Sequence, residues 1–324
     1  MKIADMHGDT IYELLNRKRE GKEVFLKEND LHMDLQKMKK ADYLLQNFAL
    51  FVGLKEDVNP YEEAKAEYTV FVEEMEKNKD LISQAVTYDD IVKNQEAGKI
   101  SALLTLEEGE ICLGDIKKLE EFYSYGARMM ALAWNYNNSL TTCNTKCDPP
   151  QPRNYHGNRV GLTETGIEFV ERMEELGMIP DVSHMSDEGI EDMLTVAKKP
   201  FVASHSNARS LCNHPRNLTD DFLKHMGEKG CVIGTNFASA FLKEGTNYSK
   251  NEWIVDHILY MVNVAGVESV GFGTDFDGIT CGLEIQNCAN MQILADLLKI
   301  RGMSETQIEQ IFYKNVLRLY KELL

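Results

Sequence analysis

The sequence predicts a single (β/α)8 TIM barrel domain with extra helices, spanning residues 1–324. Short apolar runs recur along the chain, and a helical pattern follows nearly every one of them. The runs are apolar at almost every position, as expected for parallel strands that are buried on both faces. A doubly wound open sheet would give the same alternation, but no Gly-X-Gly-X-X-Gly motif follows the first run. We therefore expect a closed barrel.

The strands of this barrel are predicted from eight apolar runs of five to nine residues. Eight such runs alternating with helices are the pattern of a (β/α)8 barrel. In chain order the runs are residues 2–6, 44–52, 101–107, 128–134, 178–184, 201–206, 231–237 and 269–276.

The helices between the runs are predicted from apolar residues that recur with the helical period. Thr163, Ser186 and Thr219 are expected to cap the starts of three of them, and Ser304 to cap the last with Gln307 three residues on. The predicted helices are residues 119–125, 163–176, 186–197, 220–228, 252–264 and 290–300, with extra helices at 31–40 and 61–77.

Charge, hydropathy and cysteine spacing limit the partners and the cellular location that we expect for this protein. The formal net charge of −17 at pH 7 argues against a nucleic acid partner, because phosphate binding requires a basic surface. No apolar stretch is long enough to span a bilayer and no signal peptide is recognisable, so we expect no membrane partner and a cytoplasmic location. The seven cysteines include no Cys-X-X-Cys pair, which predicts reduced thiols rather than a metal knuckle or disulfides.

Polar side chains end five of the eight predicted strands. In barrel enzymes the active site lies at the carboxyl ends of the strands, so these side chains should converge. All are His, Asp or Glu, the residue types that bind divalent metals through nitrogen and oxygen. They are His7 and Asp9 directly after the first run, Glu107 at the end of the third, His184 at the end of the fifth, His205 at the end of the sixth and Asp275 at the end of the eighth.

Strand alternation refines two of these choices. Residues two apart on a strand point to the same side, so His7 and Asp9 should leave the first strand side by side, an arrangement that suits zinc. The same alternation selects Glu107 over its neighbours as the residue that faces the barrel axis. We expect Glu108 and Glu110 to lie at the rim or in solvent.

The order His-X-Asp, Glu, His, His, Arg, Asp along this chain resembles the membrane (renal) dipeptidase family of binuclear zinc enzymes, within the amidohydrolase group of barrels. The most specific block is Gly-Phe-Gly-Thr-Asp-Phe-Asp-Gly at residues 271–278. The resemblance covers essentially the whole chain. Its other matching segments are residues 5–9, 106–109, 181–184, 204–206, 216–217 and 315–318.

The resemblance implies a binuclear metal site with two Zn2+ ions per chain. His7 and Asp9 would bind one zinc, His184 and His205 would bind the second, and Glu107 would bridge both. A hydroxide between the metals would then hydrolyse the peptide bond of a dipeptide substrate. The resemblance also implies a homodimer.

The resemblance assigns two further residues to the substrate. Asp275 would carry the proton from the attacking water to the leaving nitrogen, and it is placed to meet the free α-amine. Arg216 would bind the C-terminal carboxylate through its fork of donors. Clamps at both ends of the substrate would restrict the enzyme to dipeptides.

One position departs from the family pattern. The well-studied mammalian members of the family carry a substrate-contacting His at the end of the fourth strand, and Trp134 holds that place here. His156, in the loop that follows, is the candidate to substitute for it. We also expect Asp181 to point toward the helices or pair locally, and Asp277 to support the site or meet the substrate. His214 is close enough to Arg216 in the sequence to support it, but we assign it no role.

Two other functions remain open at this point. Trp134 is compatible with a related amidohydrolase that acts on another small amide, such as an N-acyl amino acid or a β-lactam. The alternative that is not an enzyme is a non-catalytic barrel, which binds metal for stability or binds peptides without cleaving them. Retention of both Asp275 and Arg216 argues against it.

Overall fold

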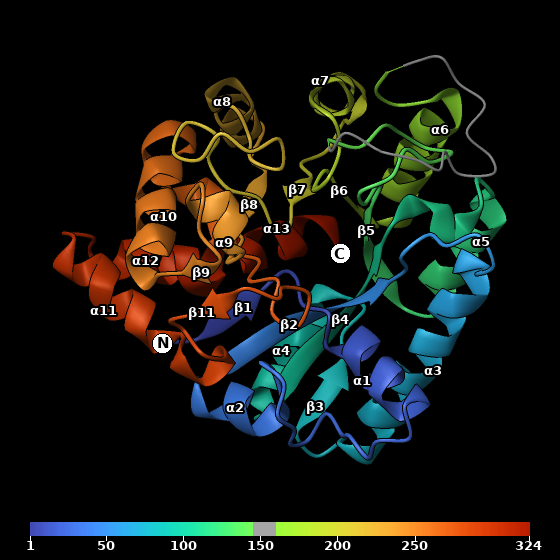
Figure 1. Cartoon of the computed structure of the whole chain (residues 1–324), viewed down its shortest axis with the longest axis horizontal. Helices are drawn as coiled ribbons and strands as arrows, with labels where there is room; N and C mark the ends of the chain where they lie inside the picture. The colour runs from blue at the N-terminus through green and yellow to red at the C-terminus, as the bar shows by residue number, and fades with distance from the viewer. Residues whose placement is uncertain (145–159) are drawn as a thin grey trace.

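In the computed structural model, which describes residues 1–144 and 160–324, eight parallel strands form a closed barrel (Figure 1). The sheet closes because β4 pairs with both β2 and β5, in register Leu45 with Ser101 on one side and Thr105 with Met129 on the other. The barrel strands are β1 (Ile3–Asp5), β2 (Tyr43–Phe51), β4 (Ile100–Glu107), β5 (Ala127–Ala131), β6 (Ile179–Asp181), β7 (Val202–Ala203), β8 (Val232–Thr235) and β10 (Val270–Phe272).

Each of the eight runs expected from the sequence forms one of these strands, which confirms the predicted barrel. Several strands are shorter than expected, because the backbone leaves the extended conformation before the polar residues at their ends. Three short strands were not expected: β3 (Ile82–Gln84) pairs with the start of β4, and β9 (Tyr248–Ser249) pairs with β11 (Gly282–Leu283).

Helices surround the barrel (Figure 1). The predicted caps are present: Thr163 accepts from Gly166 N, Ser186 from Gly189 N and Thr219 from Phe222 N, while Ser304 and Gln307 form a capping box. The helices are α1 (Thr10–Arg19), α2 (Leu35–Lys40), α3 (Pro60–Lys77), α4 (Tyr88–Glu96), α5 (Ile116–Ser124), α6 (Glu164–Leu176), α7 (Asp187–Val196), α8 (Asp220–Glu228), α9 (Ser239–Leu242), α10 (Asn251–Ala265), α11 (Gln292–Ile300), α12 (Glu305–Glu309) and α13 (Asn315–Leu323).

The core has two parts, one between the strands and the helices and one inside the barrel. Helix α13 contributes Val316, Leu319 and Tyr320 to the inner part, where they pack against inward-facing strand residues such as Leu103. Asn47 of β2 donates a 2.7 Å hydrogen bond to the Tyr320 hydroxyl. Side chains of α13 therefore complete the core inside the barrel, beneath the carboxyl ends of the strands.

None of the helices in the described ranges combines the length and apolar character needed to cross a bilayer. The six cysteines within those ranges are free thiols, and Cys147 lies outside them.

Candidate active site

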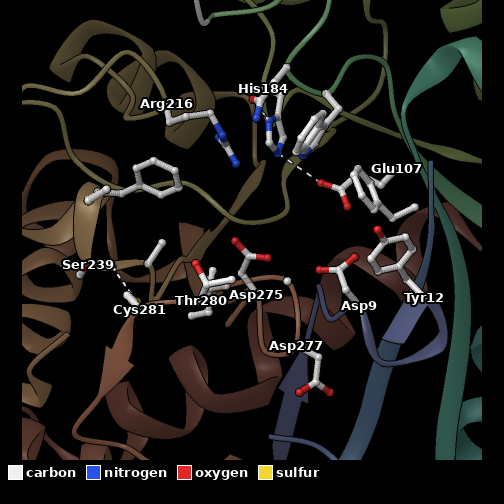
Figure 2. Close-up of a pocket in the computed structure, with 18 of the residues that line it drawn as sticks. Asp9, Tyr12, Glu107, His184, Arg216, Ser239, Asp275, Asp277, Thr280 and Cys281 are labelled. Atoms are coloured by element: carbon white, nitrogen blue, oxygen red, sulfur yellow. Dashed lines mark hydrogen bonds and ion pairs between the residues drawn. The ribbon is translucent and has the colours of Figure 1, made fainter. Parts of the chain in front are cut away.

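The six metal-site residues expected from the sequence meet at the carboxyl ends of the strands, at the base of a cavity of about 630 Å³. Figure 2 shows Asp9, Glu107, His184 and Asp275 projecting into this cavity from different strands. Arg216 and Trp134 line the same cavity. His156 lies outside the described residues.

His7 and Asp9 leave the end of β1 together, as strand alternation predicts. His7 Nε2 lies 3.4 Å from Asp9 Oδ2 and 3.3 Å from Glu107 Oε2. The buried carboxylate of Asp5 accepts a hydrogen bond from His7 N, and it also accepts from the amide and hydroxyl of Thr274. Asp5 thus ties the start of the His-X-Asp segment to the loop that carries Asp275.

Glu107 lies at the centre of the cluster, with its two oxygens directed to different partners. Oε2 faces His7, whereas Oε1 lies 3.2 Å from His184 Nε2 and 3.6 Å from His205 Nε2. A carboxylate placed between two sets of ligands can bridge two cations and offset their repulsion. The choice of Glu107 among the three glutamates agrees with this geometry.

The rings of His184 and His205 are oriented by hydrogen bonds on the side away from the cluster. Nδ1 of His184 lies 2.9 Å from Asn135 Oδ1, and Nδ1 of His205 lies 2.7 Å from Ser204 Oγ. An amide oxygen only accepts, so Nδ1 of His184 carries a proton and its Nε2 presents a lone pair. The two Nε2 atoms lie 2.9 Å apart and face the same point.

Two polar atoms of this cluster, His7 Nε2 and Asp9 Oδ1, lack a hydrogen-bond partner within the described part of the chain, although they are fully buried. Unpartnered buried polar atoms are costly unless an ion or water satisfies them. The donor set, imidazole nitrogens and carboxylate oxygens, is the one that Zn2+ and similar cations prefer. The residues therefore fit a metal centre.

Burial and mutual repulsion place a high electrostatic cost on these carboxylates. Burial, reinforced by Glu107, raises the pKa of Asp9 to about 6, and burial raises the pKa of Asp275 to about 7. Burial disfavours the charged form of His7, yet the Glu107 and Asp9 carboxylates raise its pKa well above the usual range. Only protons or cations can neutralise such a cluster.

The backbone beside the cluster is strained. His184, Asp275 and Asp277 have φ angles of 71°, 62° and 71°, a region that costs non-glycine residues of order 1–3 kcal/mol each. Asp275 Oδ2 is held by a 2.9 Å hydrogen bond from Asn236 Nδ2. Gly278 is required nearby, because a Cβ there would collide with the carboxylates of Asp9 and Asp275.

Arg216 lies above the cluster with its guanidinium directed into the cavity (Figure 2). One nitrogen, Nη2, donates to the carbonyl oxygen of His205 at 3.3 Å. Nε and Nη1 are buried and have no partner among the described residues. Two unpaired donors on a buried guanidinium are a ready site for an anionic group.

Trp134 forms part of an aromatic wall on the other side of the cavity. Its ring centroid lies 4.9 Å from that of Phe51 and 6.0 Å from that of His184, and Phe51 lies 5.1 Å from Tyr12. The sequence had indicated Trp134 but not Phe51 or Tyr12. Neither Phe51 nor Tyr12 belongs to a recognisable motif, so nothing in the local sequence marks them as cavity residues.

The expectation that Glu108 and Glu110 lie at the rim or in solvent is wrong. They are 0% and 4% exposed. Glu108 accepts from Trp134 N at 2.8 Å and from Asn138 Nδ2, and Glu110 accepts from Ser139 N at 2.8 Å. Both carboxylates organise the loop after β5, because that loop folds back over them, which strand alternation cannot reveal.

Asp181 pairs locally, as expected. It accepts from the amides of Ser183 and Ser204, each at 2.9 Å, and from the Ser204 hydroxyl. Because Ser204 gives its proton to Asp181, its oxygen is left to accept from Nδ1 of His205. The Asp181–Ser204 pair therefore orients His205, a role that the sequence did not identify.

Asp277 lines the cavity, but its carboxylate is bound to neighbouring segments rather than to the other acids. Its carboxylate points away from the other acids in Figure 2 and accepts from Thr10 Oγ1 and from His32 N, each at 2.7 Å. It therefore links the start of α1 to the segment before α2.

A model of the membrane dipeptidase family, peptidase family M19, matches residues 1–323 of this chain. An uncharacterized dipeptidase of Schizosaccharomyces pombe is 31% identical over 339 residues, covering 99% of this chain and 80% of that protein. An uncharacterized Klebsiella pneumoniae protein, described by its position in the pqqA 5′ region, is 36% identical over 211 residues, covering 64% of this chain and 76% of that protein.

Solved structures share the fold. A metallopeptidase from Rhodobacter sphaeroides, crystallised with a phosphinate mimic of the dipeptide L-Ala-D-Ala, matches with a TM-score of 0.90. The match covers 100% of this chain and 99% of that chain at 24% identity. The family match spans nearly the whole sequence. The chain therefore belongs to the membrane dipeptidase family, peptidase family M19, and is a metallo-dipeptidase of that family.

Proposed function

We propose that this protein hydrolyses free dipeptides with two zinc ions held at the carboxyl ends of the barrel strands. The observation that supports this most strongly is one cavity that contains both a buried His and carboxylate cluster and an Arg with unpaired donors. A cation site beside an anion site suits a short substrate with a scissile carbonyl and a free carboxylate.

The proposed ligands divide into two sets. His7 and Asp9 would hold one zinc, His184 and His205 the other, and Glu107 both. When bound, the cations would lower the pKa of a coordinated water and polarise the carbonyl of the scissile bond.

Asp275 is the proposed proton carrier. Its carboxylate projects into the cavity (Figure 2), and its Oδ1 lies 3.9 Å from His7 Nε2, on the same side as the first ligand set. Asn236 fixes Oδ2, so Oδ1 remains available to the substrate. Asp275 would accept a proton from the attacking water and deliver it to the amide nitrogen that leaves.

Arg216 and Trp134 are proposed to set the substrate's position. The two free donors of Arg216 would bind the C-terminal carboxylate, and the aromatic wall of Trp134, Phe51 and Tyr12 would contact apolar parts of the substrate. His156 stays a candidate for substrate contact.

A substrate panel tests this proposal. We expect the zinc-loaded enzyme to hydrolyse dipeptides such as L-Ala-L-Ala at least about 100-fold more efficiently than tripeptides or N-acetylated dipeptides, because both ends of the substrate are held. The measurement is kcat/KM for each compound. A preference for N-acyl amino acids or β-lactams would instead identify a related amidohydrolase, and tight peptide binding without turnover would identify a non-catalytic barrel.

A further inference from the structure

We propose that His214 is a second binding residue for the substrate's C-terminal carboxylate, acting beside Arg216 through its Nε2–H. This inference rests on the proposed function and adds to it a residue that is not itself part of the metal site. His214 and Arg216 line the same cavity, on the side opposite the aromatic wall of Trp134.

The proton of the His214 ring is placed by a backbone hydrogen bond. Arg216 N donates to His214 Nδ1 at 3.1 Å, so Nδ1 must be unprotonated. A neutral imidazole with a free Nδ1 carries its proton on Nε2, which then acts only as a donor. Burial, with the nearby charges of Arg216 and Arg209, lowers the pKa of His214, which favours this neutral form at pH 7.

The Nε2–H donor has no partner within the described ranges. The side-chain contacts of His214 there are the bond from Arg216 N to Nδ1 and a tilted ring contact with Phe241. Arg216 likewise has two unpaired donors, Nε and Nη1. Two buried, unpaired donors of Arg216 and one free N–H of the half-buried His214 line the same cavity, and together they suit an anion that accepts several hydrogen bonds, such as a carboxylate.

A shared aromatic surface holds the two side chains in place. The Phe241 ring of α9 lies 4.7 Å from the His214 ring and 5.2 Å from the guanidinium carbon of Arg216. Asn217 fixes the turn between them, since its amide N–H donates to the His214 carbonyl and its side chain donates to the carbonyls of Cys212 and Phe241. The donors are therefore preorganised, which reduces the entropy lost on binding.

Two substitutions at His214 separate the donor from the acceptor. His214→Asn places an oxygen near Nδ1, so the bond from Arg216 N can persist while the Nε2–H is lost. His214→Gln places an amide N–H near Nε2, so the donor can persist. His225→Asn, at an exposed histidine of α8 outside the cavity, is the matched control.

The test compares L-Ala-L-Ala with its C-terminal amide for each zinc-loaded variant. We expect His214→Asn to raise the KM for L-Ala-L-Ala by about 10- to 100-fold with little change in kcat, because a hydrogen bond to a charged group is lost. Its preference for the free carboxylate over the amide should fall by the same factor. His214→Gln should restore much of both, and His225→Asn should match the wild type.

Unchanged preference for the carboxylate in His214→Asn would overturn the inference, while wild-type hydrolysis of L-Ala-L-Ala would leave the proposed function standing. Equal losses in the Asn and Gln variants would also overturn it, since the effect would then come from ring packing rather than from the Nε2 donor. No hydrolysis of any dipeptide by the wild type would instead refute the proposed function, and this inference with it.

Discussion

At the scale of residues, the site depends on how each ligand is oriented by a partner outside the cluster. Asn135 and Ser204 hold the rings of His184 and His205, respectively, whereas Asp5 holds the backbone amide of His7. Such partners fix the ring orientation and the position of the proton, and their loss typically weakens metal binding. His184 and Asp275 also have strained, positive φ angles, and the surrounding hydrogen bonds hold the backbone in this unfavourable conformation.

Asp181→Asn tests this orientation. The amide N–H2 of the new Asn would donate to Ser204, which would turn the Ser204 proton toward Nδ1 of His205 and leave the His205 proton on Nε2, facing the metal position. We expect the affinity for one of the two zinc ions to fall about 10- to 100-fold. Chelator competition measures this affinity.

Asp256→Asn serves as the control for that experiment, since Asp256 forms a surface ion pair with Arg301. If Asp181→Asn and this control bind zinc equally well, the orienting role of Asp181 is wrong.

At the scale of elements, the barrel strands could be predicted because a strand buried on both faces is apolar at nearly every position. Helix starts could be predicted where a cap such as Thr163 or Ser304 is present. The short strand β3 and the burial of Glu108 could not be predicted, because both depend on contacts with segments distant in the sequence. The five candidate ligands and Asp275 were predicted from strand ends, whereas Asn236 and Phe51 carry no local signal.

Helix α3 contacts the aromatic wall of the cavity through a buried glutamate, Glu67, whose ionisation can be tested. Glu67 is fully buried; its Oε2 accepts from Phe51 N at 2.9 Å, and its Oε1 has no partner in the described structure. Burial raises the pKa of Glu67 well above 4.5. The folded state therefore retains a proton that the unfolded state releases as pH rises, so the wild type should lose stability from about pH 4.5 upward, until the folded pKa is passed.

Glu67→Gln removes this titration. Relative to the variant, the wild type should lose up to about 1.4 kcal/mol in free energy of unfolding per pH unit over that window. Urea unfolding at pH 5, 6, 7 and 8 measures the difference. Glu62→Gln, at an exposed position on the same helix, should run parallel to the wild type. Parallel profiles for Glu67→Gln would show that Glu67 ionises normally.

At the scale of the whole molecule, closure of the barrel brings together residues from opposite ends of the sequence. Asp9 and Asp275 lie in one cavity because β1 pairs with β10, and side chains of α13 complete the core beneath them. The carboxylates gathered there repel one another in the absence of a cation. Bound metal should thus stabilise the entire fold, since a ligand that binds only the folded state raises its stability by mass action.

The most direct test of the account is a zinc titration of protein freed of metal by chelation, with bound zinc, thermal stability and L-Ala-L-Ala hydrolysis measured at each step. We predict about two zinc ions per chain at saturation, a rise in the unfolding temperature, and hydrolysis that appears only as the sites fill. Undiminished hydrolysis by the metal-free protein, or saturation without any gain in activity, would contradict the proposed binuclear mechanism.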